Sequence, residues 1–569
     1  MAEFDLVVRG GSVVDGTGAP GRTADVAIRD GIVIEVGRVT GSARQVTDAD
    51  GALVTPGFVD IHTHYDGQVT WDSHLLPSAA HGVTTVVMGN CGVGFAPVHP
   101  GDHEKLIELM EGVEDIPGAA LHEGLPWDWE SFPELLDSMD RIPHDIDFAA
   151  QVPHGPLRLF VMGQRGADRE PATPAEIAEM GRLAAEAVRA GALGFTTSRT
   201  LNHRTSRGEP TPTLTAARDE LVGIAAAVGG TGSGVLQLIT DFIDFEDEFG
   251  TVRAVAAASG RPVSFSLMQT QRQPERWREV LDAITRANDD GLTIRGQVAT
   301  RAIGIVVGLQ ASINPLAQCP SFAPVARLPL AEQVTRLGEP AVRAAIVAEL
   351  GTSPPTMVSN LGGTFVLSDR PDYEPAPSES VAARAARAGL SPHELLYDLL
   401  LGCGGRQLLY VPIMNFADGD LRPVEEMLDH RHTIPGLGDG GAHVGIISDG
   451  SFPTTLLAHW GRDRTRGRRF DVGWLVRRHT RDTAEAVGLL DRGVLAPGYK
   501  ADVNVIDFDA LAVGAPQMVY DLPAGGKRLL QPADGYVHTI VSGATVQSAD
   551  RPTGELPGRL IRGAQPPPA

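Results

Sequence analysis

Eight short apolar runs, each followed by a stretch of helical character, recur between residues 58 and 487. The runs are Phe58–His62, Thr84–Met88, Asp147–Val152, Gly194–Thr197, Gly234–Ile239, Val263–Leu267, Thr293–Gln297 and Thr433–Gly436. Apolar strands that alternate with helices predict an α/β fold, and eight such units form a TIM-type (β/α)8 barrel. Polar residues at the carboxyl ends of these strands are then the first candidates for a functional site.

The two ends of the chain follow another pattern, in which short strands are separated by turn signals. The turn pairs are Asp15-Gly16 and Asp30-Gly31, and the later strand-like pieces are Ala501–Asp507 and Val537–Ser542. An Asp-Gly pair between apolar runs is a strong hairpin signal. We expect residues 1–57 and 488–569 to form one small β-sandwich domain, with the barrel of residues 58–487 inserted between its halves.

Three further segments complete the expected organisation. Residues 303–430 are too long for an ordinary connection, so we expect an insertion or lid there. Gly10-Gly11 is expected to be a turn, and the Pro-rich end, Gln565-Pro-Pro-Pro-Ala569, a disordered tail. Two long uncharged runs, 221–240 and 302–326, are interrupted by glycine, proline and amide residues, which favours buried strands and loops over membrane spans.

Composition limits the partners and the compartment. A formal net charge of −23 over 569 residues argues against binding nucleic acid, which requires basic patches. Three cysteines without a Cys-x-x-Cys pair do not form a disulfide framework, and an acidic residue near the start replaces the basic segment of a signal peptide. We therefore expect a cytoplasmic protein that binds neither nucleic acid nor membrane.

The segment 54–66 carries the strongest chemical signal. Val59 and Ile61 alternate with His62 and His64 on a strand whose successive side chains face opposite ways, so the two histidines share one face. They are about 6.7 Å apart along the strand, and their rings can converge on one ion beyond its end. Imidazole suits zinc and other divalent metals. The alternative, two surface histidines on an edge strand, leaves the apolar run at Phe58 unexplained.

The chain resembles the amidohydrolase superfamily and, within it, the N-acyl-D-amino-acid deacylase (D-aminoacylase) branch. The resemblance covers nearly the whole chain. Its motifs are Pro56-Gly-Phe-Val-Asp-Ile-His-Thr-His64, Gly82-Val-Thr-Thr-Val86, Gly89-Asn-Cys-Gly92, Asp128-Trp-Glu-Ser-Phe132, His154-Gly-Pro-Leu-Arg158 and Gly493-Val-Leu-Ala-Pro-Gly-Tyr-Lys-Ala-Asp502. It implies a metal-dependent barrel, flanked by a β-sandwich, that hydrolyses amide or other C–N bonds.

The resemblance also implies roles for single residues. Asp439 stands where the superfamily keeps a strand-eight aspartate that contacts the metal and acts as general base, with Asp449 as the rival position. Cys91 stands where the branch places a thiolate ligand, although a lone cysteine is also a common small buried residue. His154 is expected to contact the substrate or polarise its carbonyl, with a structural role as the alternative. His443 is expected to line the substrate pocket and to orient Asp439.

The sequence departs from the two-metal pattern of the superfamily. No histidine occurs between His203 and His393, a window that contains predicted strands five and six, where Gln237 and Gln269 lie near the expected ligand positions. No lysine lies between Lys105 and Lys500 to bridge two metals. We therefore expect one divalent ion, zinc, held by His62, His64 and Asp439, with Cys91 or water completing its shell. His203, on the loop after strand four, is a candidate replacement ligand.

These observations predict a hydrolase that cleaves the amide of an N-acyl amino acid or a related small amide. The carboxylate of such a substrate suits arginine, and Arg199, Arg204 and Arg301 follow predicted strands. The alternatives are a cyclic amide or imide hydrolase, another C–N chemistry on the same barrel, and a binding protein that has lost catalysis. The resemblance also implies a homo-oligomer.

Overall fold

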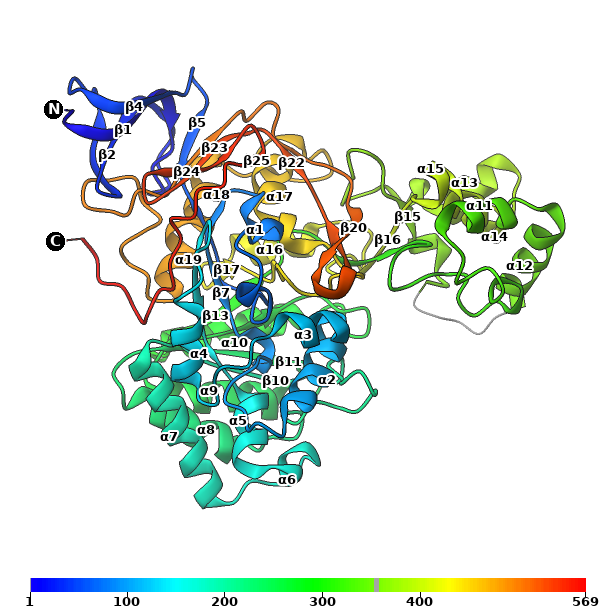
Figure 1. Cartoon of the computed structure of the whole chain (residues 1–569), viewed down its shortest axis with the longest axis horizontal. Helices are drawn as coiled ribbons and strands as arrows, with labels where there is room; N and C mark the ends of the chain where they lie inside the picture. Colours follow the sequence, from blue (N-terminus) through cyan, green and yellow to red (C-terminus); the bar gives the residue numbers. More distant parts are fainter. Residues whose placement is uncertain (1, 353–357, 569) are drawn as a thin grey trace.

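Strands from both ends of the chain lie in one sheet. The computed structural model describes residues 2–352 and 358–568. The sheet runs in the order β25-β24-β23-β18-β5-β1-β2-β3, with β4 beside β1 (Figure 1). Its strands are β1 (Phe4–Val13), β2 (Arg22–Arg29), β3 (Ile32–Gly37), β4 (Ala43–Asp48), β5 (Leu53–Pro56), β18 (Val503–Ile506), β23 (Tyr536–Val541), β24 (Ala544–Ser548) and β25 (Arg551–Pro552). The antiparallel pairing of β5 with β18 joins the two chain ends.

Two sequence expectations for the chain ends are wrong. Gly10-Gly11 is not a turn between two strands but an irregularity within β1, where the register against β2 shifts between Val8 and Gly11. The Pro-rich end is not free of contacts, because the Gln565 amide donates to the carbonyl of Gly488 and its carbonyl accepts from Leu490. These bonds hold the tail against the segment that follows the last helix of the chain.

The central part of the chain is built from parallel strands, in agreement with the predicted α/β class. One arc contains β6 (Phe58–Asp60), β7 (Val83–Met88) and β8 (Asp147–Ala150). The other contains β9 (Val152–Pro153), β10 (Gly194–Arg199), β11 (Val235–Thr240), β12 (Val263–Leu267), β13 (Ile294–Val298) and β17 (Thr433–Pro435). All pairs within the arcs are parallel. The described ladder is therefore two arcs, not one continuous closed barrel.

The edge strands β6 and β17 of the two arcs meet through the loops that follow them, and these loops carry candidate site residues. Beyond β6 and β17, the Asp439 amide donates to the His62 carbonyl at 3.0 Å and the His64 amide donates to the Gly440 carbonyl at 2.8 Å. An isolated parallel bridge between Thr63 and Gly440 marks the same contact. These bonds bring the loop after the first strand against the loop after the last one.

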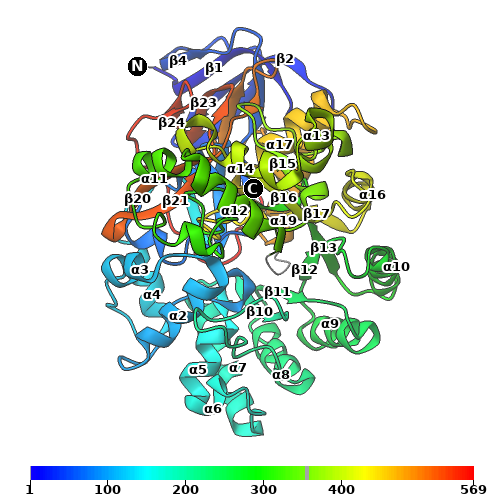
Figure 2. The same ribbon diagram turned by 90° about the vertical axis from the view of Figure 1, so that its right-hand side faces the viewer.

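Amphipathic helices cover the longer arc (Figure 2). They are α7 (Pro174–Ala190), α8 (Arg218–Gly229), α9 (Phe245–Ser259) and α10 (Arg276–Asp289). Helix α7 begins as its sequence predicts, because Thr173 and Glu176 form a reciprocal capping box and Pro174 occupies the first turn. Helix α10 buries Trp277, Val280 and Ile284 toward the strands; each large apolar side chain buried in this way contributes about 1.5–3 kcal/mol of transfer free energy.

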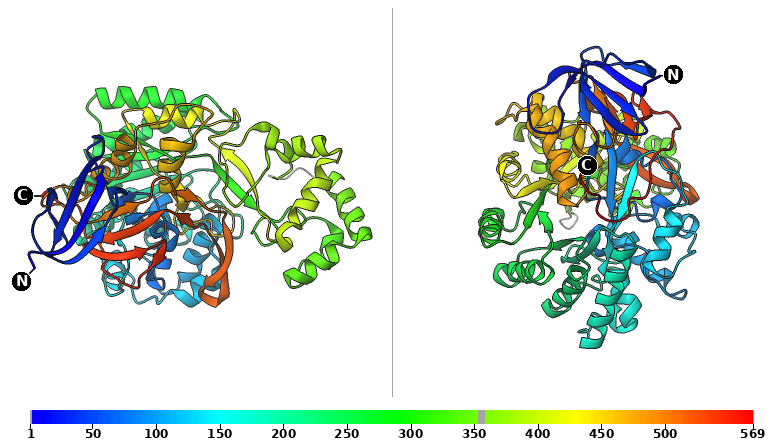
Figure 3. Two further views of the ribbon diagram at one scale, coloured as in Figure 1. Left: turned by 90° about the horizontal axis from the view of Figure 1, so that it is seen from above. Right: turned by 90° about the vertical axis from the view of Figure 1, so that its left-hand side faces the viewer.

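Residues between β13 and β17 form a separate lobe (Figure 1, right; Figure 3, left). Its base is an antiparallel sheet of β14 (Ile303–Val307), β16 (Leu409–Met414) and β15 (Phe365–Val366). The helices above it are α11 (Leu330–Leu337), α12 (Pro340–Thr352), α13 (Val381–Ala388), α14 (Pro392–Leu400) and α15 (Gly402–Gly405). They share an apolar core of their own, which includes Leu316, Leu337 and Leu400. Helix α16 (Arg422–Asp429) leads back to β17.

The two long uncharged runs of the sequence lie in these elements. The run 221–240 forms most of α8 and strand β11, and the run 302–326 begins with β14 and enters the lobe. Among the described residues, no helix combines the length and the apolar character needed to span a membrane.

Candidate metal centre

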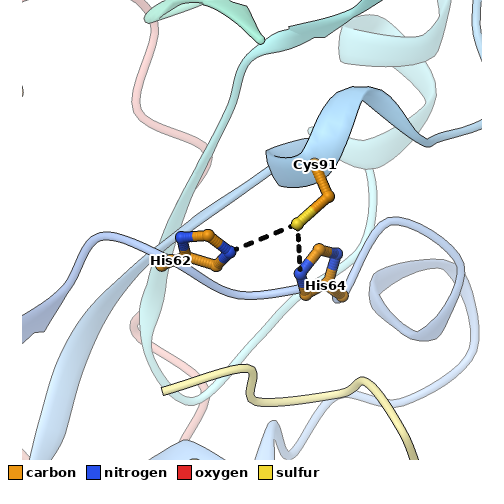
Figure 4. A group of neighbouring side chains, drawn as sticks. All are labelled: His62, His64 and Cys91. Carbon is orange, nitrogen blue, oxygen red and sulfur yellow. Dashed lines mark hydrogen bonds between the residues drawn. The ribbon is translucent and has the colours of Figure 1, made fainter. Parts of the chain in front are cut away.

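His62 and His64 lie in the loop that follows β6, with their rings buried (Figure 4). The loop cannot shift freely, because Thr63 donates to the Val87 carbonyl and His64 to the Gly440 carbonyl. The two imidazole rings are 5.5 Å apart between centroids. The strand ends at Asp60 rather than at the predicted His62, but both rings still lie on one side of the chain, as predicted, and both point toward the sulfur of Cys91 (Figure 4).

Cys91 reaches the two histidines from a tight turn after β7. Gly89, Cys91 and Gly92 all have left-handed backbone angles, with φ of 84°, 56° and 67°. A Cβ on Gly89 would lie 2.2 Å from the Gln151 carbonyl oxygen, so this position requires glycine. The turn carries Cys91 Sγ to 3.4 Å from His62 Nε2 and 3.6 Å from His64 Nε2. The donor atoms of these three residues all lie within 4.8 Å of one another.

Asp439 adds a carboxylate from the loop after β17. Its Oδ1 lies 3.3 Å from His62 Nε2 and 3.6 Å from His64 Nε2. Donors that share one zinc ion at bond lengths of about 2.0–2.3 Å in a tetrahedron are about 3.3–3.7 Å apart. The four separations to the histidine nitrogens fall in that range. Among the described residues, however, the group of donors that are all within 4.8 Å of one another contains only His62, His64 and Cys91, so Asp439 approaches the histidines without being equally close to the sulfur. Two imidazoles, a thiolate and a carboxylate are also a donor set that suits zinc.

Burial governs the charges of these groups. It lowers the pKa of His62 and His64, which favours the neutral rings that bind metal. Burial, assisted by the nearby carboxylates of Glu114 and Asp439, raises the pKa of the Cys91 thiol. Burial alone would raise the pKa of Asp439, but hydrogen bonding to His64 and the charges of the nearby histidines lower it. Asp439 is therefore ionised and available as a ligand, whereas the Cys91 thiol requires a cation to lose its proton.

One acidic residue at the centre was not predicted from the sequence. Glu114 is the last residue of helix α2 (His103–Glu114), and its side chain is 1% exposed. Its Oε1 lies 3.3 Å from His64 Nδ1 and its Oε2 lies 3.6 Å from His443 Nε2. Helical spacing places Glu114 four residues after the buried Met110, on the buried face of α2, but the sequence does not show that this face ends against a loop fifty residues earlier.

Two glutamines flank the outer nitrogen of His62. Gln297 Oε1 lies 2.7 Å from His62 Nδ1, and Gln237 Nε2 lies 3.2 Å from the same atom. Gln297 was not predicted as a site residue, although it is a polar residue at the end of an apolar predicted strand. Gln269 does not reach the centre, because its amide bonds to Ala417 and Asp418 instead.

The remaining predicted histidines have different surroundings. His154 bonds through Nδ1 to Thr197 and through Nε2 to Glu220, so it has no free nitrogen for a substrate, and this geometry supports the structural alternative. His203 bonds through Nδ1 to Ser198. Burial, followed by the charge of the nearby His443, lowers the pKa of His203 to about 3. His443 contacts Glu114 rather than forming the expected hydrogen bond to Asp439.

The predicted arginines do not converge on the four donors. Arg199 lies 3.9 Å from Asp247, and Arg204 is exposed and donates to the Gly208 carbonyl. Arg301 is 1% exposed and binds Asp449 and the Ser448 carbonyl. In this structure Arg301 therefore holds a buried loop, and the expectation that it binds substrate stays a prediction. Asp449, the alternative to Asp439 as general base, is bound to Arg301, and burial raises the pKa of Asp449 to about 7.

Comparison with known proteins identifies the family of the chain. A family model described as the amidohydrolase family matches residues 45–547. The chain is 27% identical to a D-aminoacylase of Alcaligenes xylosoxydans xylosoxydans, over 98% of this chain and 97% of that protein. It is 28% identical to an N-acyl-D-glutamate deacylase of the same organism, with the same coverage of 98% and 97%.

Two solved structures share the fold over the whole chain. A D-aminoacylase aligns with a TM-score of 0.65 at 24% identity, over 98% of this chain and 100% of that one. An N-acyl-D-glutamate deacylase from Bordetella bronchiseptica, complexed with zinc and a phosphonate inhibitor, aligns with a TM-score of 0.64 at 24% identity, over 98% and 99% of the two chains. The chain belongs to the amidohydrolase family, in its D-aminoacylase branch, and is a hydrolase that acts on C–N bonds.

Proposed function

We propose that the protein hydrolyses the amide bond of an N-acyl amino acid, in particular a D-amino acid, or of a related small amide, with the aid of one zinc ion. The observation that supports this proposal is the set of four separations, 3.3–3.6 Å, between the donor atoms of Cys91 and Asp439 and the Nε2 atoms of His62 and His64. The deacylases among its relatives give the substrate class.

A divalent ion held by these residues would polarise the amide carbonyl and lower the pKa of a water molecule. Asp439 is the general base of the proposed reaction, since its side chain is 15% exposed whereas those of His62 and His64 are 1% exposed. Among these three side chains, only Asp439 is open enough to accept a proton from a water on the substrate side. His62 and His64 remain neutral donors, and the outer nitrogen of His62 is held by Gln297.

The proposal of a single ion follows from the residues near a possible second position. The side-chain amide of Gln269 is hydrogen-bonded through its nitrogen to Asp418 and through its oxygen to Ala417, both in the segment after β16. Gln237 contacts the ring of His62. A related D-aminoacylase is described with a binuclear metal centre. In this chain the corresponding strands supply amides, and a neutral amide oxygen is a poor zinc ligand.

Three further parts of the proposal rest on the relatives and on the strand pairings. We propose that the two parallel arcs close into a TIM-type barrel through the contact of residues 62–64 with 439–440. We also propose that the protein is cytoplasmic, forms a homo-oligomer and takes a small amide as its substrate.

The test combines metal analysis with a substrate panel. The full-length protein is purified without chelator, and its metal content is measured by elemental analysis. Activity is then measured by release of free amino groups from N-acetyl-D- and N-acetyl-L-amino acids, with a cyclic amide as the comparison substrate. We expect about one zinc per chain and hydrolysis of at least one N-acyl amino acid.

Each outcome bears on a different part of the proposal. Two ions per chain would contradict the single-ion site but leave the reaction in place. Zinc binding with activity only on the cyclic amide would replace the substrate class. A protein that takes up no divalent ion even when zinc is added would overturn the mechanism.

A further inference from the structure

The end of helix α2 contacts two loops of the metal centre at once. Glu114 Oε1 lies 3.3 Å from His64 Nδ1, and Glu114 Oε2 lies 3.6 Å from His443 Nε2. By hydrogen-bond geometry neither carboxylate oxygen has a partner among the described residues, and neither has His64 Nδ1, so both contacts are ion-pair distances; the side chain is 1% exposed. A buried carboxylate costs several kcal/mol unless its partners compensate, so the ionised form of Glu114 depends on these two imidazoles.

The backbone around Glu114 fixes where its carboxylate lies. The His443 amide donates to the Glu114 carbonyl, and the Gly445 amide donates to Asp115 Oδ2 at 3.0 Å. Asp115 ends the helix in the left-handed region, with φ of 53°. The helix end and the loop that follows Asp439 are therefore joined by their main chains, and the carboxylate projects between that loop and His64.

The position of Glu114 matters because an imidazole binds metal with only one nitrogen at a time. The Nε2 atom of His64 faces Cys91 Sγ and Asp439 Oδ1, both at 3.6 Å. For Nε2 to offer its lone pair, the ring proton must sit on Nδ1, and a carboxylate beside Nδ1 accepts that proton in a hydrogen bond. Glu114 occupies that place.

We infer that Glu114 is a positioning residue that holds His64 in its metal-binding tautomer and ties the His443 loop to the same carboxylate. This inference rests on the proposed function, since it concerns the same centre. His62 differs, because its Nδ1 is oriented by the neutral amide of Gln297 at 2.7 Å. A carboxylate strengthens the donor character of its imidazole more than an amide does, so His64 is the stronger histidine donor of the pair.

The test uses Glu114→Gln in the full-length protein, with Glu104→Gln as the matched control. Glu104 lies on the same helix, but its side chain is 58% exposed and its partner is His122. Zinc affinity is measured by competition with a chromophoric chelator. The absorption spectrum of the cobalt(II)-substituted protein and the thermal midpoint of the metal-free protein are recorded for each variant.

We expect Glu114→Gln to bind zinc about 10–100-fold more weakly and to change the cobalt(II) spectrum. The midpoint of the metal-free protein should not fall, because the amide has the shape of the carboxyl group and neither Glu114 oxygen has a hydrogen bond to lose among the described residues. Glu104→Gln should match the parent in all three measurements. A role in packing alone would lower the midpoint and leave the spectrum unchanged.

Two results overturn the inference, and they are distinguishable from failure of the proposed function. If the parent binds zinc and Glu114→Gln binds it within twofold, Glu114 does not position the donor, whereas the proposed function stands. If the metal-free midpoint falls and the cobalt(II) spectrum is that of the parent, the residue is structural. A parent that binds no divalent ion overturns both proposals together.

Discussion

Replacing Asp439 with asparagine tests its proposed role as general base apart from its proposed role as a metal ligand. Asparagine keeps the shape of the side chain and an oxygen near Oδ1, which lies 3.3 Å from His62 Nε2. It removes the charge and the ability to accept a proton. Cys91→Ser is the matched comparison, because Cys91 is a proposed ligand that is only 5% exposed and has no proposed role in proton transfer.

The expected sizes of the two effects differ. A positioned general base contributes about 10²–10⁴ in rate, which corresponds to about 3–5 kcal/mol of activation free energy. Asp439→Asn should therefore lower kcat by about that factor even when the site is saturated with zinc. Cys91→Ser removes a soft ligand, so it should weaken zinc binding and recover most of its kcat when zinc is raised.

The assay measures kcat for the best N-acyl amino acid against zinc concentration for the parent and the two variants. Metal content is measured in the same samples, so that loss of the ion is distinguished from loss of the base. If Asp439→Asn retains more than about a tenth of the parent kcat at saturating zinc, Asp439 is a ligand only. The base would then have to be another group in the pocket.

Two further predictions concern buried charges away from the centre. Asp147 binds Arg492 at 2.7 Å and Lys500 at 2.9 Å; burial would raise its pKa, but these two cations lower it. Asp147→Asn should therefore lower the free energy of unfolding, measured with urea, by about 3–5 kcal/mol. A loss below about 1 kcal/mol would contradict this prediction. Burial would raise the pKa of Glu374, but bonds from His459 and Arg464 lower it to about 2. The stabilisation from Glu374 is thus present above the usual glutamate pKa and is lost as pH falls from about 5 toward 2. Glu374→Gln should be less stable than the parent at pH 7 in thermal unfolding, and this difference should shrink with acid; a constant difference would refute the assignment.

The parallel strands and the first half of the site could be predicted because their signals are local. All eight predicted apolar runs contain observed strands, and the period of two places His62 and His64 on one face. The start of α7 was also predictable, because its capping box and its first-turn proline are formed by residues that are close together in the sequence.

The rest could not be predicted because it depends on contacts between distant segments. Arg301 follows a strand, as a substrate-binding arginine would, but the direction of its side chain is set by Asp449 far along the chain. Glu114 ends an ordinary amphipathic helix, and only the approach of the His64 and His443 loops makes it part of the centre. Periodicity shows which face of an element is buried, not which loop meets its end.

Gln237 within β11 and Gln297 within β13 bear on the proposal of a single ion. Gln237 is one of the two glutamines near the positions where the resemblance implies histidines for a second metal, and Gln297 lies at hydrogen-bond distance from His62 Nδ1. Each is buried, so an amide there must find a partner or lose hydrogen-bond energy. His62 Nδ1 can donate its proton to Gln297 Oε1, which leaves its Nε2 atom free for an ion, but the same N–H cannot also accept a hydrogen bond from Gln237 Nε2. Gln237 also retains a buried oxygen with no hydrogen-bond partner among the described residues. The proposed single-ion site is therefore supported by Gln297, whose amide can fix the ring of one proposed ligand, rather than by both glutamines.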